Sequence, residues 1–222
     1  MKVLNLYAGI GGNRRLWEGV DVTAVELNPK IAAIYQDFFP QDKVIVADAH
    51  EFLLANFKDY DFIWSSPPCP SHSSFRKSFS MANGAKPIYP DMKLYEEVLL
   101  LKHYFEGKWV VENVKSFYEP LIRPSELQRH YFWHNFHIPQ RSFESDTILL
   151  TGGSKPNDDV DDEIQIERLQ GRHGFDLSKY ELSNIATRTA LRNCVTPELG
   201  LHILNYARKQ EDDLFKISPK EL

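Results

Sequence analysis

The sequence of 222 residues contains little cysteine, no long apolar run and no excess of positive charge. Its two cysteines, Cys69 and Cys194, are too few for a disulfide framework or a four-cysteine zinc site, and they fit a reducing compartment. No apolar run approaches the roughly 18 residues that span a bilayer. The short apolar start soon meets Gly9, so it predicts a strand and not a secretion signal. We therefore expect a cytoplasmic protein without a membrane partner.

Positive charge is scarce overall but concentrated in one segment. The chain has 26 Lys and Arg against 31 Asp and Glu, so global basicity gives no hint of a nucleic-acid partner. Between Pro67 and Pro90 there are no acids and three cations, namely Arg76, Lys77 and Lys86. Long loops of this kind are usually functional, and this one predicts a polyanion contact. Residues 151–167 hold one lysine against six acids and are expected to form a solvated loop that faces away from nucleic acid.

Short apolar runs alternate with helical stretches along the chain. The runs are apolar on consecutive positions and rich in β-branched or aromatic residues, which is typical of strands buried on both faces of a parallel sheet. These runs are Val3–Tyr7, Val22–Leu27, Val44–Ala47, Phe62–Trp64 and Trp109–Val114. Helices are predicted over Pro29–Phe39 and Asp91–Phe105, a strand over Tyr131–Phe136, and an amphipathic segment that packs on the sheet over Pro197–Gln210. The alternation predicts a doubly wound α/β fold with a mostly parallel sheet.

Glycines and acids follow the first three predicted strands. The first strand runs into three closely spaced glycines, Gly9, Gly11 and Gly12. They allow a ligand to approach the backbone closely, although a plain strand–helix turn explains them equally well. A dinucleotide fingerprint would place glycine where Arg14 stands, which argues against a pyrophosphate. Glu26 is placed to accept both hydroxyls of a ribose, and Asp48 either meets an adenine amino group or caps the next helix.

Two chemically important side chains follow or end the fourth and fifth strands. Cys69 stands between Pro68 and Pro70, and such rigid flanks suit a nucleophile that must hold its direction. The alternative is a structural buried cysteine. Glu112 lies in an apolar strand, where an unpaired charge is costly, so it indicates either a proton donor or a salt-bridged core acid. Because the two strands should end near each other, we expect both side chains in one site.

In order and spacing these motifs resemble the cytosine-5 DNA methyltransferase family. The residues that carry the resemblance are Tyr7–Gly12, Glu26, Asp48, Pro67–Cys69, Glu112–Val114 and Arg192–Pro197. The resemblance implies a Rossmann-like S-adenosylmethionine-dependent methyltransferase fold. It also implies that a methyl group passes from S-adenosylmethionine, which becomes S-adenosyl-L-homocysteine, to carbon 5 of a cytosine flipped out of double-stranded DNA. The small size suggests a bacterial or phage-infected cell as the setting.

The resemblance also implies roles for individual residues. Cys69 would add to carbon 6 of the ring, and Glu112 would bind its edge and donate a proton. Arg129 aligns with the last arginine of the family's Gln-x-Arg-x-Arg motif, while Leu127 stands at the first, so Arg141 is a second candidate for a base-facing cation. The cofactor would be held by Tyr7, Gly9, Gly11, Gly12, Glu26, Leu27, Asp48, Ala49, Pro68, Asn193 and Val195. DNA would be contacted by Ser71, Arg76, Lys77, Lys86 and Arg141, and no metal is assigned.

The chain is short for this family. It is expected to comprise a catalytic core over residues 1–136, a reduced recognition region over 137–186 and a segment over 187–222 that returns to the cofactor pocket. A full target-recognition domain does not fit. Recognition therefore falls to the 69–90 loop, to the reduced region or to a separate specificity partner.

Three alternatives remain beside DNA cytosine methylation. The first is the same chemistry on RNA such as tRNA, which relatives perform. The second is a catalytically weak module that binds cofactor or DNA and needs a partner, which the departure at Leu127 suggests and intact Cys69 and Glu112 oppose. The third, a dinucleotide oxidoreductase, is disfavoured by Arg14.

Overall fold

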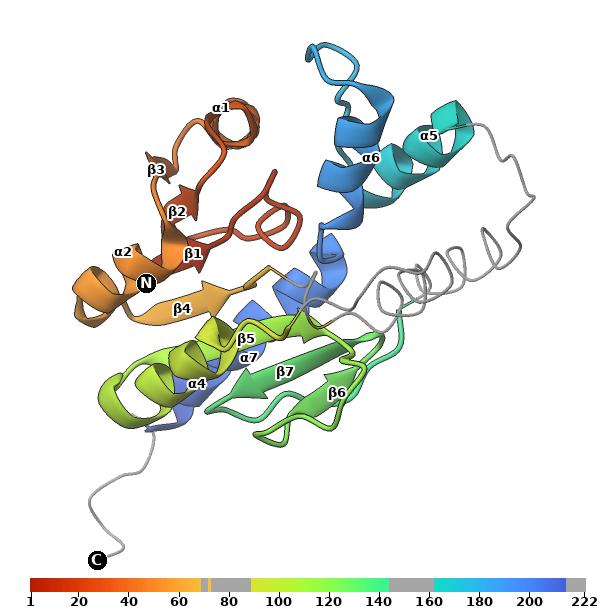
Figure 1. Ribbon diagram of the computed structural model, residues 1–222. Helices are drawn as coiled ribbons and strands as arrows, with labels where there is room; N and C mark the ends of the chain where they lie inside the picture. The colour runs from red at the N-terminus through yellow and green to blue at the C-terminus, as the bar shows by residue number, and fades with distance from the viewer. Residues whose placement is uncertain (69–71, 73–88, 144–161, 215–222) are drawn as a thin grey trace, which may run out of the picture.

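A computed structural model describes residues 1–68, 72, 89–143 and 162–214 (Figure 1). Its centre is a seven-stranded sheet in the order β3-β2-β1-β4-β5-β7-β6. The strands are β1 Lys2–Leu6, β2 Asp21–Glu26, β3 Lys43–Val46, β4 Phe62–Ser65, β5 Lys108–Val114, β6 Ser125–Leu127 and β7 His130–His134. Strands β1 to β5 pair in parallel, and β7 and β6 continue the sheet in antiparallel pairs. The mostly parallel sheet is confirmed, and β6 is an addition to the predicted strands.

The strand order reverses between β1 and β4. From β1 the chain first extends the sheet through β2 and β3, and then returns to the other side of β1 with β4 and β5. Such a reversal opens a crevice beyond the carboxyl ends of the neighbouring strands, where α/β proteins bind their ligands. The topology therefore directs the residues that follow β1, β2, β4 and β5 toward one site.

Helices cover both faces of this sheet. They are α1 Pro29–Phe38, α2 Ala49–Asn56, α4 Lys93–Tyr104, α5 Asp162–His173, α6 Asn184–Arg192 and α7 Pro197–Leu214, with a 3-10 turn over Phe57–Asp59. Helices α2 and α4 pack in one apolar cluster with the sheet, and α7 packs in a second cluster on the opposite face. Helices α5 and α6 pair with each other and join α1 in a third cluster.

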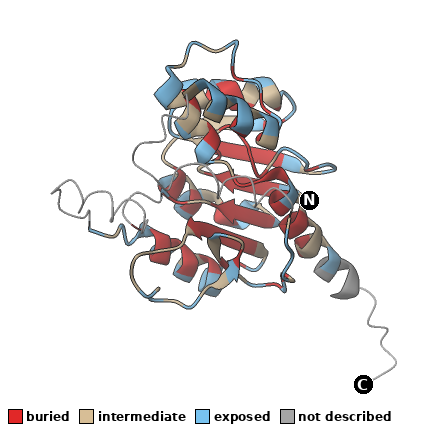
Figure 2. Cartoon of the chain, turned by 90° about the vertical axis from the view of Figure 1, so that its right-hand side faces the viewer, coloured by how far each residue is buried: buried red, intermediate tan, exposed pale blue. Residues whose placement is uncertain are grey.

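Consecutive residues of the central strands contribute to opposite faces. In β4, Phe62 and Trp64 belong to the cluster under α7, whereas Ile63 belongs to the cluster under α2 and α4. All three side chains are fully buried, and the strands form the buried middle layer in Figure 2. The uninterrupted apolar runs of the sequence thus arise because both faces of the sheet are covered.

The predicted start of the first helix at Pro29 and the C-terminal packing are confirmed, whereas α4 begins at Lys93 and not at the predicted Asp91. Asn28 caps α1 by accepting a hydrogen bond from the amide of Lys30 at 2.9 Å, and Pro29 follows at the first helical position. Helix α7 buries Leu199, Ile203 and Leu204 completely against the sheet. The end of the chain is therefore part of the same core as its beginning.

The expected acidic loop over residues 151–167 is wrong from Asp162 onward. Residues 162–167 form the first half of α5, while 151–161 lie outside the described residues. Acids in a first helical turn are stabilised by the helix dipole, and Asp162 also pairs with Arg188 of α6. Leu169 is buried against the α1 side of the core. Within the described residues, no helix is long and apolar enough to cross a membrane.

Candidate active site

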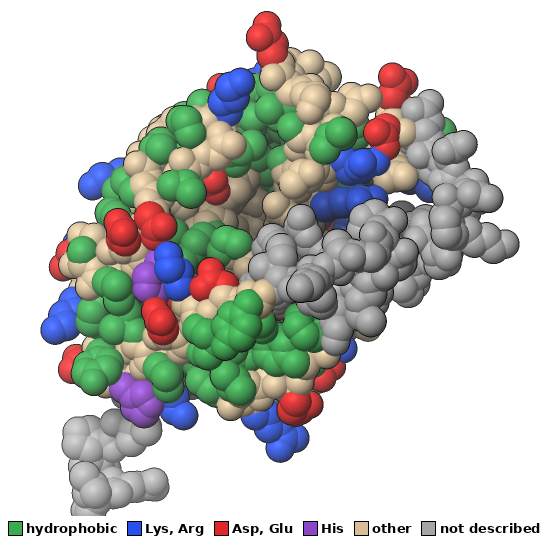
Figure 3. Space-filling view, viewed as in Figure 1, with side chains coloured by type: hydrophobic (Ala, Val, Ile, Leu, Met, Phe, Trp, Pro, Cys, Tyr) green, Lys and Arg blue, Asp and Glu red, His purple; other side chains and the backbone are tan. Residues whose placement is uncertain are grey.

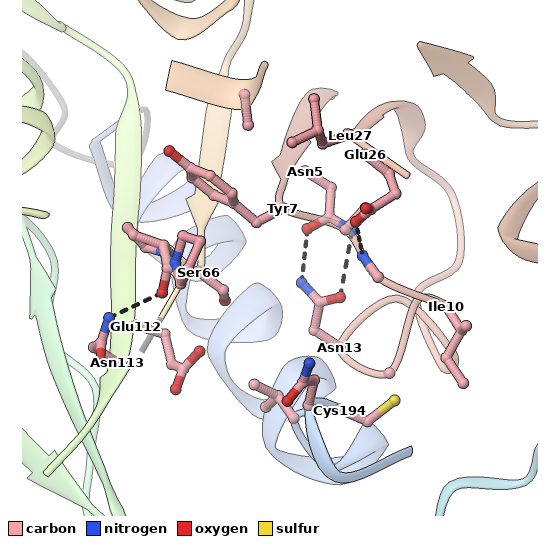
Figure 4. Close-up of a pocket in the computed structure, with 18 of the residues that line it drawn as sticks. Asn5, Tyr7, Ile10, Asn13, Glu26, Leu27, Ser66, Glu112, Asn113 and Cys194 are labelled. Atoms are coloured by element: carbon pink, nitrogen blue, oxygen red, sulfur yellow. Dashed lines mark hydrogen bonds between the residues drawn. The ribbon is translucent and has the colours of Figure 1, made fainter. Parts of the chain in front are cut away.

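A cavity of about 1190 Å³ opens at the carboxyl ends of the parallel strands (Figure 4). Its walls come from the ends of β1, β2, β4 and β5, the starts of α2 and α4, and the segment after α6. Ten of the eleven predicted cofactor residues line it, namely Tyr7, Gly9, Gly12, Glu26, Leu27, Asp48, Ala49, Pro68, Asn193 and Val195. Glu112 lines the same cavity. The fold thus gathers residues that are far apart in the sequence into one site.

The Glu26 carboxylate is held in place by backbone amides. One oxygen accepts from the amide of Gly9 at 3.0 Å and the other from the amide of Asn28 at 2.9 Å. Gly9 has φ 55°, and a side chain there would be strained. A carboxylate has about four acceptor positions, so two amides leave Glu26 able to accept further hydrogen bonds from a ligand.

Gly11 and Gly12 are required by packing on opposite sides of the turn. A Cβ at Gly11 would lie 2.3 Å from the ring of Phe39, and Gly11 does not line the cavity. A Cβ at Gly12 would lie 2.5 Å from the Cβ of Cys194. Gly12 thus allows the segment after α6 to approach the first turn, which brings Asn193 and Val195 to the cavity. Asn193, Cys194 and Val195 all line the cavity.

Asp48 caps helix α2, the second of the two roles considered for it. Its Oδ1 accepts from the amide of Glu51 at 3.0 Å, and this hydrogen bond is the main reason why the pKa of Asp48 is lowered. The cap fixes Asp48 and Ala49 in the cavity wall.

Leu27, which also lines the cavity, is 66% exposed although it is apolar. Such a side chain at a cavity gives a flat ligand an apolar surface to contact.

Asn113 connects the two strand ends on the other side of the cavity. Its side-chain amide donates to the backbone oxygen of Pro67 at 3.0 Å (Figure 4). Strands β4 and β5 are neighbours in register, with Ser65 opposite Val111. The chain that leads toward position 69 is therefore held beside Glu112. The family resemblance includes Asn113 in the Glu112–Val114 motif but implies no role for it.

His130 is the side chain that faces Glu112, and sequence reasoning missed it. Its Nε2 lies 3.7 Å from Glu112 Oε1, and both residues line the cavity. The Glu112 side chain is only 9% exposed. Strands β5 and β7 pair so that His130 stands opposite Val114, two positions along from the Glu112–Phe132 pair and therefore on the same face of the sheet. The clue in the sequence was a histidine at the start of a strand that pairs with the Glu112 strand.

The two arginines expected to face the base lie elsewhere. Arg129 is exposed in the turn between β6 and β7, and it does not line the cavity. Arg141 is also exposed, with its guanidinium 5.2 Å from the centre of the Phe143 ring. The one-residue step from Arg129 to His130 matters because the turn ends there, and alternate residues of a strand face opposite sides.

Five predicted residues lie outside the described residues, namely Cys69, Ser71, Arg76, Lys77 and Lys86.

His72, which is described, is buried in the cavity wall. Its Nδ1 lies 2.5 Å from the hydroxyl of Tyr118, and its backbone oxygen accepts from the amide of Phe117. Burial lowers the pKa of His72. The chain three residues after Cys69 is therefore tied to the segment that follows β5.

The cavity fits a nucleoside-like methyl donor. Glu26 retains acceptor positions that would suit ribose hydroxyls, Leu27 presents an apolar surface, and Gly9 adds no side chain to the wall beside Glu26. In Figure 3, Lys and Arg side chains of the described surface are interspersed with Asp and Glu, and they form no continuous basic face. The described residues on this face therefore create no broad field of positive charge.

The family model for C-5 cytosine-specific DNA methylase matches residues 1–121. The chain belongs to this family. This methylase uses S-adenosylmethionine as methyl donor for cytosine-5 methylation. The matched residues contain every strand from β1 to β5 and therefore both Glu26 and Glu112. No protein in a search of curated sequences matches the chain.

Solved structures share the fold of the methylase. The Entamoeba histolytica methyltransferase EhMeth superposes with a TM-score of 0.53 at 13% identity, over 96% of this chain and 98% of that chain. The Dnmt2 methyltransferase of S. pombe superposes with a TM-score of 0.58 at 12% identity, over 95% of this chain and 99% of that chain. At such identities the likeness shows a common fold, here the Rossmann-like methyltransferase fold.

Proposed function

We propose that the chain methylates carbon 5 of cytosine in double-stranded DNA through a covalent adduct of Cys69. The observation that carries this proposal is the hydrogen bond from Asn113 to the Pro67 backbone oxygen, at 3.0 Å, in the cavity that Glu26 and Glu112 also line. This contact holds the strand end that precedes the nucleophile beside the acid. Methyl donor and base would therefore meet in one enclosed space.

The methyl donor is assigned to the wall formed by β1, β2 and α2. Glu26 would accept the ribose hydroxyls, Leu27 would contact the adenine, and Asn193 and Val195 would close the same wall. Bound S-adenosylmethionine would supply the electrophilic methyl group that carbon 5 takes up. The residues of this wall bind and orient, and none of them needs to exchange a proton.

The base is assigned to the wall formed by β4, β5 and β7. The sulfur of Cys69 would add to carbon 6 while Glu112 hydrogen-bonds N3 and the exocyclic amine, donating a proton as negative charge develops on the ring. His130 stands beside Glu112 and would stabilise that charge by a hydrogen bond. After methyl uptake, carbon 5 gives up its proton to solvent and the sulfur leaves as a thiolate. The proton on N3 then returns to Glu112, and the thiolate takes up a proton from solvent, which restores the starting state.

Target selection is assigned to residues 69–90 or to a separate specificity partner. Helices α5 and α6 pack on α1 as part of the main core, and they form a small helical pair. Arg192 at the end of α6 lines the cavity, so this pair reaches the site. The composition of residues 69–90 supports contacts with nucleic-acid phosphates by Arg76, Lys77 and Lys86.

Transfer of tritium-labelled methyl groups to two substrates tests the proposal. We expect the purified chain to label cytosine-containing duplex DNA and to leave unmodified tRNA unlabelled. Cys69→Ala should abolish labelling, because burial raises the pKa of the other thiol of the sequence, that of Cys194, to about 12. Labelling of tRNA alone would assign the RNA reaction. Labelling of neither, with retained cofactor binding, would favour a binding module.

A further inference from the structure

Glu97 is a buried acid that the proposed chemistry does not use. It lies on α4, on the face that also buries Leu94, Val98 and Leu101. Its side chain has no solvent exposure. An ionised carboxylate in such a place is costly unless it is paired and hydrogen-bonded, so its partners show what it stabilises.

Three elements that border the cavity meet at this carboxylate. The hydroxyl of Tyr7, directly after β1, donates to Oε1 at 2.6 Å. The hydroxyl of Ser65, the last residue of β4, donates to Oε2 at 2.5 Å. The Nδ1 of His50, in the first turn of α2, lies 3.1 Å from Oε1. Glu97 thus connects the ends of β1 and β4 with the start of α2, and all three elements border the cavity.

Tyr7 has an unfavourable backbone conformation. Its φ is 55°, in the left-handed region that a bulky aromatic residue rarely adopts. This conformation directs the chain into Ala8 and Gly9, whose amide holds Glu26. Burial, and then the negative charge of Glu97, raise the pKa of Tyr7 well above its ordinary value. The Tyr7 hydroxyl therefore stays protonated and donates its hydrogen bond. Because the acceptor is the Glu97 carboxylate, this hydrogen bond is stronger than one between two neutral groups.

We propose that Glu97 is a positioning residue for the methyl donor, acting through Tyr7. The bond from the Tyr7 hydroxyl holds the strained turn in the conformation that presents Gly9 and Glu26 to the ligand. Without it, the turn relaxes toward an ordinary backbone conformation, and only a fraction of the molecules has a site ready to bind. The apparent affinity for the donor then falls by that fraction. The inference rests on the cofactor wall in the proposed function.

Calorimetric titration of the full chain with S-adenosyl-L-homocysteine tests this role without methyl transfer. We expect Glu97→Gln to weaken binding about tenfold, because the amide keeps the shape but loses the charge and one acceptor oxygen. We expect Tyr7→Phe to weaken it by a similar factor. The double variant should bind about as tightly as each single variant, since both substitutions remove the same Tyr7–Glu97 hydrogen bond. Glu96→Gln is the matched control, because Glu96 neighbours Glu97 and its side chain is 62% exposed, with Oε2 3.4 Å from the outer nitrogen Nε2 of His50.

Each outcome decides the role of Glu97. Wild-type affinity in Glu97→Gln, measured well below its melting temperature, would reduce Glu97 to a stabilising core residue and overturn the proposal. So would independent effects that multiply to about a hundredfold in the double variant, or an equal loss in Glu96→Gln. If Glu97→Gln does not fold, unchanged affinity in Tyr7→Phe overturns the proposal and weakened affinity supports it. A wild-type chain that binds no S-adenosyl-L-homocysteine would instead contradict the cofactor wall itself.

Discussion

The two walls of the cavity each contain an acid at a strand, but they hold it differently. Glu26, the last residue of β2, accepts from two backbone amides and remains partly exposed. Glu112, in β5, is buried and faces the imidazole of His130 at 3.7 Å. Backbone amides fix a carboxylate as a permanent acceptor, whereas a buried carboxyl beside an imidazole is suited to proton exchange with a bound base. In the proposed function, the same residue type therefore serves binding on one wall and chemistry on the other.

The largest effect on activity should come from a substitution in the wall formed by β4, β5 and β7. Glu112→Gln keeps the shape of the side chain but removes the proton donor, so we expect kcat to fall by about 10²- to 10⁴-fold. Binding of S-adenosyl-L-homocysteine should stay within about twofold, because Glu112 belongs to the other wall. Single-turnover labelling and calorimetry measure the two quantities. A large loss of cofactor affinity with normal kcat would contradict the assignment of Glu112 to the wall that acts on the base.

The opposite pattern is expected for Glu26→Gln. The amide presents one acceptor oxygen where the carboxylate presents two, so a ribose hydroxyl loses its partner. We expect the affinity for S-adenosyl-L-homocysteine to fall about 10- to 100-fold, with kcat at saturating cofactor much less changed. Calorimetry and initial rates at high cofactor concentration check this. An unchanged affinity would remove Glu26 from the binding wall.

His130→Gln should give a smaller effect in the wall formed by β4, β5 and β7. Glutamine retains one hydrogen-bond donor but cannot become a cation, so we expect kcat to fall about tenfold with cofactor affinity unchanged. His137→Gln is the matched control, because His137 is exposed just after β7. Equal rates for wild type and His130→Gln would show that the 3.7 Å approach to Glu112 has no part in the reaction.

The smallest effect concerns the pH dependence of stability through His50. The hydrogen bond with Glu97 raises the pKa of His50 above its ordinary 6.5, although burial opposes this shift. A raised folded-state pKa contributes stability that is complete below pH 6.5 and is lost as the pH rises through the raised value. Denaturant unfolding of wild type and His50→Gln should thus give a free-energy difference that shrinks above pH 6.5. A difference that grows there would contradict a protonated His50.

Strand positions were readable from the sequence because the sheet is buried on both faces. Runs such as Phe62–Trp64 leave few options other than a central strand. Helix α5 was not readable, because its exposed acidic start resembles a solvated loop and its packing depends on distant α1. Strand β6, with three residues, exists only because it pairs with β7.

Within the site, residues in motifs were predicted and residues that support them were not. Glu26 and the cavity position of Glu112 follow from strand ends, since a parallel sheet brings such ends together. Glu97 carried a usable signal, because it interrupts the apolar face of α4 between Leu94 and Leu101. His130 and not Arg129 lies beside Glu112. Predicting which of the two enters the cavity requires the exact end of a turn, which sequence patterns locate only to within a few residues.

The most direct test of the central claim is the mass of a covalent complex. A duplex with 5-fluorocytosine blocks loss of the substituent at carbon 5, so the adduct of Cys69 should accumulate after methyl transfer and survive denaturation. We predict one complex per chain for wild type and none for Cys69→Ala. Cys194→Ala, which removes the other thiol, should still form it, because burial raises the pKa of Cys194 to about 12 and leaves it unreactive. A complex that persists in Cys69→Ala, or that wild type never forms while it methylates DNA, would contradict the account.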